Sequence, residues 1–312
     1  MQIPSCMIGK VTINPALYNG AGTIKKVEDV KEAARCEATG AILVGSITVE
    51  ERQENPIPNF WIGPTGSINS WGIPNPGKSY YRRHLPEMAK IAHDAGKPLF
   101  LSEVGFTPAE FGELAEVAAE GGADGVELNF GCMNIWDGGI QKRCPSFLPD
   151  VIGQILEHVR RIADDLVIMA KFSHYSDPFL LKEVAEVIKV HGVVHAVTTC
   201  NTSPNAYGED KNGRPLIKAG GGLGGFGGFG FKNIALGQVV QWRAALPRGI
   251  AVIGVGGISS GEDMAEYFRY DKVVAVQVAT ALLTKHHLDL HILDRFLLEF
   301  SELPEQEPET AA

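Results

Sequence analysis

Short β-type runs alternate with segments of helical periodicity along nearly the whole chain, and this alternation restricts the fold more than any other feature. Strands are predicted at residues 11–18, 41–44, 99–104, 125–129, 166–172, 196–200, 251–255 and 273–278. Helices are predicted at residues 27–39, 81–95, 108–120, 147–162, 178–190, 233–246, 261–268 and 288–300. Eight strand–helix units in 312 residues predict an α/β fold, a (β/α)8 TIM barrel.

Long connections follow strands two, four and six of the predicted barrel, at residues 45–79, 131–146 and 201–232. In a barrel these loops open at the same end, so we expect them to build a ligand pocket together. No linker rich in proline or serine divides the chain. We therefore expect one barrel domain over residues 1–302, followed by an acidic, disordered tail over residues 303–312.

Charge and cysteine content argue against several classes of function. The formal net charge is −9 and the pI is near 5.5, which argues against nucleic acid or an anionic membrane as a partner. Five scattered cysteines without a CxxC pair predict reduced thiols, so neither disulfides nor a metal site is expected. The sequence shows no leader pattern and no apolar run long enough to span a bilayer. We expect a cytoplasmic protein that binds a small molecule.

One cysteine, Cys132, stands between Asn129 and Asn134 where the fourth predicted strand opens into its loop. The carboxyl ends of parallel strands carry the chemistry of such folds. A thiol can act as a base when its pKa is tuned, and a carboxamide can bind a polar edge without adding charge. The segment indicates proton abstraction from a neutral, hydrogen-bonding ring. A small buried hydrophobe in a turn is the alternative.

Further candidate residues follow strands two, five and six. Lys171 closes the fifth strand, where its ammonium could stabilise a reduced flavin, polarise a carbonyl, form a Schiff base or simply line the rim. Asn201 and Thr202 follow the sixth strand, and Asn69 lies in the loop after the second. Four asparagines from three loops favour recognition of a ring with alternating N–H and C=O groups.

Two glycine-rich segments offer backbone surfaces. Residues 66–75, which include Trp71, Gly72 and Ile73, can direct backbone N–H groups at an anion or a carbonyl, or can form a tight turn. Residues 220–230 can form a flexible lid, a backbone surface against a flat ligand, or low-complexity chain. Glycine content alone does not separate these options.

A phosphate site is predicted at the ends of the last two strands. Gly256 and Gly257 follow the seventh strand, and Ala279 and Thr280 follow the eighth. Backbone amides at these two places, next to a helix N-terminus, form the recurrent phosphate site of such barrels. The phosphate of a cofactor such as FMN fits this site.

In the order and spacing of these motifs, the chain resembles the class 1 dihydroorotate dehydrogenases, which are soluble, FMN-dependent enzymes of pyrimidine biosynthesis. The match extends from residues 19–22 to residues 280–282, and its most specific parts are residues 66–75 and the Asn-x-x-Cys-x-Asn pattern at residues 129–134. The resemblance implies oxidation of dihydroorotate to orotate, in which a cysteine removes a ring proton while hydride passes to FMN. It also implies that residues 1–302 form a single FMN-binding domain and that the protein is a cytoplasmic homodimer.

The resemblance also implies roles for individual residues. Cys132 would be the catalytic base, and Lys171 would be a catalytic residue beside the flavin. Substrate binding is implied for Asn69, Trp71, Gly72, Ile73, Asn129, Asn134, Asn201 and Thr202. FMN binding is implied for Ala21, Gly22, Gly45, Ser46, Asn129, Lys171, Gly227, Gly228, Gly256, Gly257, Ala279 and Thr280.

Gly45 departs from the family pattern, which has at this place a lysine that contacts the flavin and the substrate carboxylate. Losing such a contact costs about 1.5–3 kcal/mol, up to about a hundredfold in affinity. The substrate is then either dihydroorotate or a related dihydropyrimidine or cyclic amide with a different substituent. Gly45→Lys is therefore expected to raise the affinity for orotate.

Two other classes of protein remain as alternatives. A phosphate-binding barrel without flavin would be a lyase or aldolase that uses Lys171 as a Schiff base. A flavin- or nucleotide-binding protein that has lost catalysis would account for the absent lysine at Gly45. Retention of Cys132 and of the four asparagines favours an active flavoprotein oxidoreductase that acts on a CH–CH group.

Overall fold

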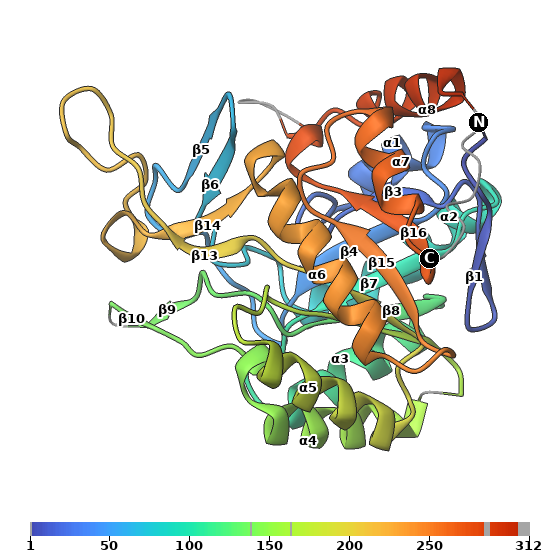
Figure 1. Ribbon diagram of the computed structural model, residues 1–312. Helices are drawn as coiled ribbons and strands as arrows, with labels where there is room; N and C mark the ends of the chain where they lie inside the picture. Colours follow the sequence, from blue (N-terminus) through green and yellow to red (C-terminus); the bar gives the residue numbers. More distant parts are fainter. Residues whose placement is uncertain (1, 138, 163, 284–287, 305–312) are drawn as a thin grey trace.

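The computed structural model describes residues 2–137, 139–162, 164–283 and 288–304. Its main sheet has eight parallel strands in the spatial order β3-β16-β15-β12-β11-β8-β7-β4, and a parallel bridge between Tyr18 and Ala41 joins the two ends. The strands are β3 (Leu17–Asn19), β4 (Ile42–Ile47), β7 (Leu99–Glu103), β8 (Gly125–Asn129), β11 (Val167–Lys171), β12 (Ala196–Thr198), β15 (Ala251–Val255) and β16 (Val273–Val278). They form the barrel at the centre of Figure 1, which confirms the predicted (β/α)8 fold.

Helices surround the barrel and alternate with its strands along the chain (Figure 1). They are α1 (Val27–Arg35), α2 (Lys78–Asp94), α3 (Pro108–Glu120), α4 (Pro149–Val159), α5 (Pro178–His191), α6 (Lys232–Ala245), α7 (Gly261–Phe268) and α8 (Ile292–Glu302). The start of α3 shows how local sequence sets these bounds. The side chain of Thr107 accepts a hydrogen bond from the backbone N–H of Glu110, and Pro108 occupies a position where its missing N–H costs nothing.

The apolar faces of the helices pack on the outside of the barrel. In α4, Ile152, Ile155, Leu156 and Val159 are completely buried, as expected for an amphipathic helix with apolar residues three and four apart. Burial of each such side chain contributes about 1.5–3 kcal/mol. This packing makes the barrel a rigid support for the side chains at its rim.

The first predicted strand, residues 11–18, is wrong as a single element. It is divided into β2 (Val11–Ile13), which forms an antiparallel hairpin with β1 (Cys6–Ile8), and the barrel strand β3. Pro15 lies between the two and has no N–H to donate to a ladder, so the strand cannot continue through it.

The predicted tail at residues 303–312 lies outside the described residues, apart from Leu303 and Pro304.

The long loops after β4 and β12 pair with each other in a small antiparallel sheet. Its spatial order is β13-β14-β6-β5, formed by β5 (Phe60–Gly63), β6 (Gly66–Asn69), β13 (Ser203–Ala206) and β14 (Gly224–Gly227). Figure 1 shows this sheet gathered at one end of the barrel. The glycine run of residues 220–230 is therefore partly a strand. The loop after β8 carries a short hairpin of β9 (Trp136–Asp137) and β10 (Ile140–Gln141).

The close packing of β14 against its neighbours explains why the strand contains glycines. A Cβ atom at Gly225 would lie 2.1 Å from Oγ1 of Thr202, and one at Gly224 would lie 2.6 Å from the carbonyl oxygen of Asn69. Bare backbone is therefore required where the loop sheet meets the barrel rim.

None of the helices in the described residues combines the length and the apolar character that crossing a bilayer requires.

Candidate active site

A cavity lies at the carboxyl ends of the barrel strands, beneath the sheet formed by the long loops. It encloses about 1230 Å³, including the space at its open mouth. All but one of the predicted site residues line it; these are Ala21, Gly22, Ser46, Asn69, Trp71, Gly72, Ile73, Asn129, Cys132, Asn134, Lys171, Asn201, Thr202, Gly227, Gly228, Gly256, Gly257, Ala279 and Thr280. The exception is Gly45. The structure thus brings together side chains from all three long loops, as the unequal loop lengths predicted.

The four asparagines form two hydrogen-bonded pairs. The side-chain amide of Asn201 donates to Oδ1 of Asn129 at 3.0 Å, which links the rims of β12 and β8. The amide of Asn134 donates to Oδ1 of Asn69 at 3.1 Å, which links the cysteine loop to β6. Asn69 in turn donates to the carbonyl of Gly225 at 3.1 Å. Each carboxamide plane is therefore fixed by a partner on another element.

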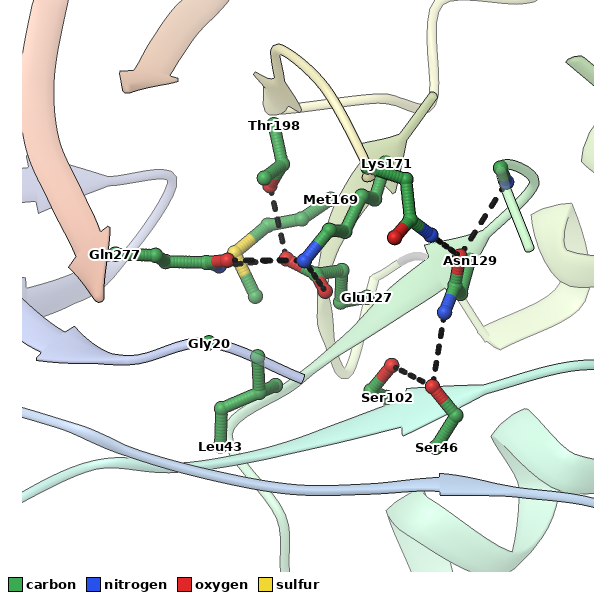
Figure 2. Close-up of polar contacts among 12 residues, drawn as sticks. Gly20, Leu43, Ser46, Ser102, Glu127, Asn129, Met169, Lys171, Thr198 and Gln277 are labelled. Carbon is green, nitrogen blue, oxygen red and sulfur yellow. Dashed lines mark hydrogen bonds and ion pairs between the residues drawn. The ribbon is translucent and has the colours of Figure 1, made fainter. Parts of the chain in front are cut away.

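Asn129 is held by the hydroxyl of Ser46, which in turn contacts the hydroxyl of Ser102. Its amide nitrogen donates to Oγ of Ser46 at 2.9 Å, and the hydroxyls of Ser46 and Ser102 lie 2.9 Å apart (Figure 2). Both serines are buried, at the ends of β4 and β7. This chain of hydrogen bonds fixes which face of Asn129 points toward the cavity.

Cys132 lies in the loop after β8 and lines the cavity with a partly exposed side chain. Burial raises the pKa of its thiol above the ordinary value of 9.0, while the backbone of Asn134 and the positive charges of Arg52 and Lys171 act in the opposite direction. The thiol form predominates at neutral pH, and the two cations favour the thiolate.

Lys171 projects from the end of β11 into a buried polar network (Figure 2). Its ammonium nitrogen lies 3.8 Å from Oε1 of Glu127 and donates to Oε1 of Gln277 at 3.4 Å. The other oxygen of Glu127 accepts hydrogen bonds from Thr198 at 2.9 Å and from Gln277 at 2.6 Å. These contacts hold the ammonium in a single place at the base of the cavity.

Bare backbone lines the opposite part of the cavity. Gly228, Gly256 and Gly257 have φ values of 93°, 121° and 74°, which favour glycine. A Cβ atom at Gly257 would lie 2.6 Å from the Cα of Lys232, so no larger residue fits there without movement. Within the described chain, the N–H groups of these three glycines have no hydrogen-bond partner. These donors form a cradle whose geometry suits an anion.

A second set of free backbone donors lies at residues 71–73. Gly72 and Ile73 have φ values of 81° and 60°. Hydrogen bonds to its carbonyl groups fix the segment in place. Arg52 donates to the carbonyl of Gly72 at 3.0 Å, and the backbone N–H of Asn55 donates to the carbonyl of Trp71 at 2.9 Å. The N–H groups of residues 71–73 have no partner among the described residues, although all three residues line the cavity.

Gly45, which was predicted to bind the cofactor, lies within β4 and does not line the cavity. Its carbonyl accepts from the N–H of Gly22 at 2.6 Å, and its own N–H donates to Ile24 at 2.9 Å. Its φ is 109°, and a Cβ atom would lie 2.4 Å from the carbonyl oxygen of Ser102. Gly45→Lys is therefore expected to disturb the strand, which contradicts the expectation that it would strengthen orotate binding.

Sequence reasoning missed several residues of the cavity wall, among them Lys25, Phe60 and Gln277. Gln277 could have been found, since it stands near the end of the eighth strand like the other rim residues. Lys25 follows the glycine turn after the first strand and belongs to no motif. Phe60 lies in β5 and packs on Trp71 with ring centroids 5.2 Å apart, a contact that only the folded loop reveals.

Comparisons with known proteins agree with this geometry. The family model described as dihydroorotate dehydrogenase matches residues 5–297. The chain is 29% identical to dihydroorotate dehydrogenase A (fumarate) of Lactococcus lactis subsp. cremoris, over 94% of this chain and 91% of that protein. It is 30% identical to the catalytic subunit of dihydroorotate dehydrogenase B (NAD(+)) of Pyrococcus furiosus, over 88% of this chain and 86% of that protein.

Solved structures show the same fold at lower sequence similarity. The ligand-free DHODH of Eimeria tenella superposes with a TM-score of 0.77 and 17% identity, covering 95% of this chain and 86% of that one. The family match spans almost the whole barrel and all the rim residues that form the cavity. This chain therefore belongs to the dihydroorotate dehydrogenase family.

Proposed function

We propose that this protein oxidises dihydroorotate to orotate with FMN as its cofactor, and that Cys132 removes the ring proton. One observation carries the proposal: Cys132, Lys171 and the carboxamides of four asparagines line one cavity at the carboxyl ends of the strands. No aspartate, glutamate or histidine lines the described part of this cavity. The thiol is therefore the available base for a ring proton.

The paired carboxamides suit a ring that carries alternating N–H and C=O groups. The contacts between Asn134 and Asn69, and between Asn201 and Asn129, each use one of the two hydrogens of the donating amide. The second hydrogen and the remaining oxygen lone pairs can bind the ring. Because each amide is already fixed by a partner, little conformational entropy is lost when the ring binds.

Proton removal requires the thiolate of Cys132. Burial raises the pKa of this thiol, so the positive charges of Arg52 and Lys171 are needed to favour the reactive form. A closed cavity strengthens both interactions, because a ligand that displaces water lowers the local dielectric constant. Proton removal from the ring carbon beside a carbonyl is then coupled to hydride loss from the neighbouring carbon.

The structure offers a suitable place for FMN. The phosphate would bind to the free N–H groups of Gly228, Gly256 and Gly257, where a Cβ atom at Gly256 or Gly257 would meet neighbouring atoms at less than 3.0 Å. Lys171 would lie beside the ring system and stabilise negative charge on it. FMN would supply the acceptor for the hydride. We include Ala21, Gly22, Ser46, Gly227, Ala279 and Thr280 in the proposed FMN site.

The same network disfavours a lyase or aldolase that forms a Schiff base. A Schiff-base lysine needs a nitrogen free to attack a carbonyl, whereas Nζ of Lys171 is held by contacts with Glu127 at 3.8 Å and Gln277 at 3.4 Å.

The proposal extends to a cytoplasmic homodimer. In support of the dimer, Ile234 and Val240 are exposed apolar side chains on α6, and the exposed Phe229 lies in the turn just before this helix. Sedimentation velocity would test it.

The function is tested by anaerobic stopped-flow spectroscopy of the purified holoenzyme. We expect dihydroorotate to bleach the flavin absorbance, and Cys132→Ser to retain FMN but to slow this reduction by about a hundredfold or more. Cys6→Ser is the matched control, because Cys6 is also a partly buried thiol but lies in β1 outside the cavity. Reduction of Cys132→Ser at the wild-type rate would overturn the role of the thiol. A flavin that dihydrouracil bleaches and dihydroorotate does not would overturn the substrate.

A further inference from the structure

The described lining of the active-site cavity contains two charged side chains, and both are lysines. They are Lys171 and Lys25. Lys171 already has an anionic partner, since Glu127 lies 3.8 Å from its ammonium nitrogen. Lys25 has none: within the described chain its ammonium makes no hydrogen bond and no ion pair. Among the described residues, the cavity therefore contains one cation without a direct anionic partner.

Lys25 is nevertheless held in a defined position. Its backbone N–H donates to Oδ2 of Asp29 at 2.9 Å, and its carbonyl accepts from the hydroxyl of Tyr81 at 3.1 Å. Its ammonium lies 5.6 Å from the ring centroid of Trp71, within the range of a cation–π contact. The side chain is thus anchored at one end by the loop before α1 and oriented at the other by the indole.

The surroundings of Lys25 leave its charge poorly solvated. Burial lowers the pKa of Lys25, and the carboxylates of Asp29 and Glu54 offset this effect only in part. Both carboxylates are engaged elsewhere: Asp29 accepts the N–H groups of Lys25 and Lys26, and Glu54 accepts from Asn59 at 3.2 Å. An anion that entered the cavity beside Trp71 would restore the solvation that the ammonium has lost.

We propose that Lys25 binds the carboxylate of the ring substrate, together with the free backbone N–H groups of Trp71, Gly72 and Ile73. This inference rests on the proposed function. Trp71 connects the two sets of donors, because its indole faces the ammonium while its backbone begins the row of free amides. A positive charge from the loop after β3 thereby takes the role that Gly45 cannot fill, because a side chain at Gly45 would meet the carbonyl of Ser102.

The carboxylate is favoured over a phosphate as the anion at this place. The three free amides of the glycine cradle form a separate set of donors at Gly228, Gly256 and Gly257, on the loops after β14 and β15. Those amides satisfy a phosphate without a lysine of their own. The segment of residues 71–73 instead lies on the same loop as Asn69, which belongs to the carboxamide set.

The test is a titration of orotate against the flavin absorbance of the holoenzyme. We expect Lys25→Met and Lys25→Gln to raise the Kd for orotate by about ten- to a hundredfold, which corresponds to the loss of a charge-assisted hydrogen bond. Lys25→Arg should retain most of the affinity, because it keeps the charge. Lys26→Met is the matched control, since the neighbouring lysine is exposed and lies outside the cavity. Uracil, which lacks the carboxylate, should bind wild type and Lys25→Met equally.

Three outcomes would count against the inference. An unchanged orotate Kd in both neutral variants overturns it. Loss of FMN from these variants, with unchanged orotate affinity in the remaining holoenzyme, assigns the ammonium to the flavin phosphate and also overturns it. An equal loss of uracil affinity shows that Lys25 acts on the ring or on loop structure. Failure of the proposed function looks different, because dihydroorotate would then not reduce the wild-type flavin.

Discussion

The ammonium nitrogen of Lys171 lies 3.8 Å from Oε1 of Glu127, and both side chains are buried where β11 and β8 run side by side. Oε1 of Glu127 has no hydrogen bond within the described chain, although its partner oxygen has two. The lysine charge is thus the compensation for this oxygen. The contact with Glu127 fixes the position of the Lys171 ammonium at the base of the cavity.

We expect Glu127→Gln to lower the free energy of unfolding by about 3–5 kcal/mol, because it leaves a buried ammonium without its counter-charge. Urea denaturation measures the change. The double variant Glu127→Gln/Lys171→Met should lose less than the sum of the two single variants, because the buried charge is then absent. Strict additivity of the three values would contradict an interaction between the two side chains.

The rate of flavin reduction should rise with pH to a plateau well above neutrality. The thiolate of Cys132 is the active form, and burial raises the pKa of this thiol above 9.0, so the active fraction increases as the pH approaches that raised value. Arg52→Met removes a charge that favours the thiolate, so its profile should move to higher pH with a similar plateau. An unchanged midpoint of the pH profile would show that the charge of Arg52 does not affect the pKa of the Cys132 thiol.

Gly45→Ala should destabilise the protein by about 1–3 kcal/mol, because the residue has a φ of 109° and the added methyl would meet the carbonyl oxygen of Ser102. Comparison with Gly22→Ala separates the effect of backbone strain from that of the clash with Ser102. Gly22 also has a positive φ, 93°, but a Cβ atom there has no neighbour within 4 Å. Thermal unfolding of both variants should show the larger loss at Gly45, and equal losses would leave backbone strain as the sole cause.

Glu103 provides a pH-dependent stability test. It is fully buried at the end of β7, neither carboxyl oxygen has a hydrogen-bond partner among the described residues, and burial raises its pKa well above the ordinary value of 4.5. The folded state therefore holds a proton that the unfolded state releases above pH 4.5, so this group lowers stability progressively as the pH rises from that value.

Replacing the carboxyl group with an apolar side chain removes that penalty. We expect Glu103→Met to raise the melting temperature at pH 7–8 and to do so by less near pH 4.5. Glu116→Met is the control, because Glu116 is exposed on α3. A gain for Glu103→Met that did not vary with pH would mean that the buried carboxyl group is not the cause.

Much of the barrel could be predicted because its elements have strong local patterns. The predicted bounds 108–120, 125–129, 251–255, 261–268 and 273–278 coincide with α3, β8, β15, α7 and β16. The loop sheet could not be predicted in this way. Its strands β6 and β14 have four residues each, and three of those in β14 are glycines, so neither shows the alternation that marks a strand. The two strands also pair residues that are far apart in the chain.

The candidate site was predictable to the extent that it uses strand ends. Asn129 and Lys171 end barrel strands, and Cys132, Asn134 and Asn201 follow such strands within five residues, so the fold alone brings them to one end. Asn69 lies in β6 of the loop sheet, and its place depends on how that sheet folds. Their mutual contacts were not predictable, since the pairing of Asn129 with Asn201 depends on the register between loops. Lys25 was missed for a similar reason: its significance comes from Trp71, which approaches it only in the folded protein.

The antiparallel pairing of β6 with β14 also bears on the order of folding. The hydrogen bond from Asn69 to Gly225 closes a separation of 156 residues, whereas most barrel strands pair with neighbours one helix away. Contacts of such long sequence separation form late, because the chain between them must already be arranged. Closure of the barrel is a contact of the same kind, because β16 pairs with β3 across 259 residues, so both the closed barrel and the sheet over its cavity are expected late in folding. Nascent chains would acquire affinity for the ligand only in the last step of folding, and binding of the cofactor would then stabilise the completed cavity.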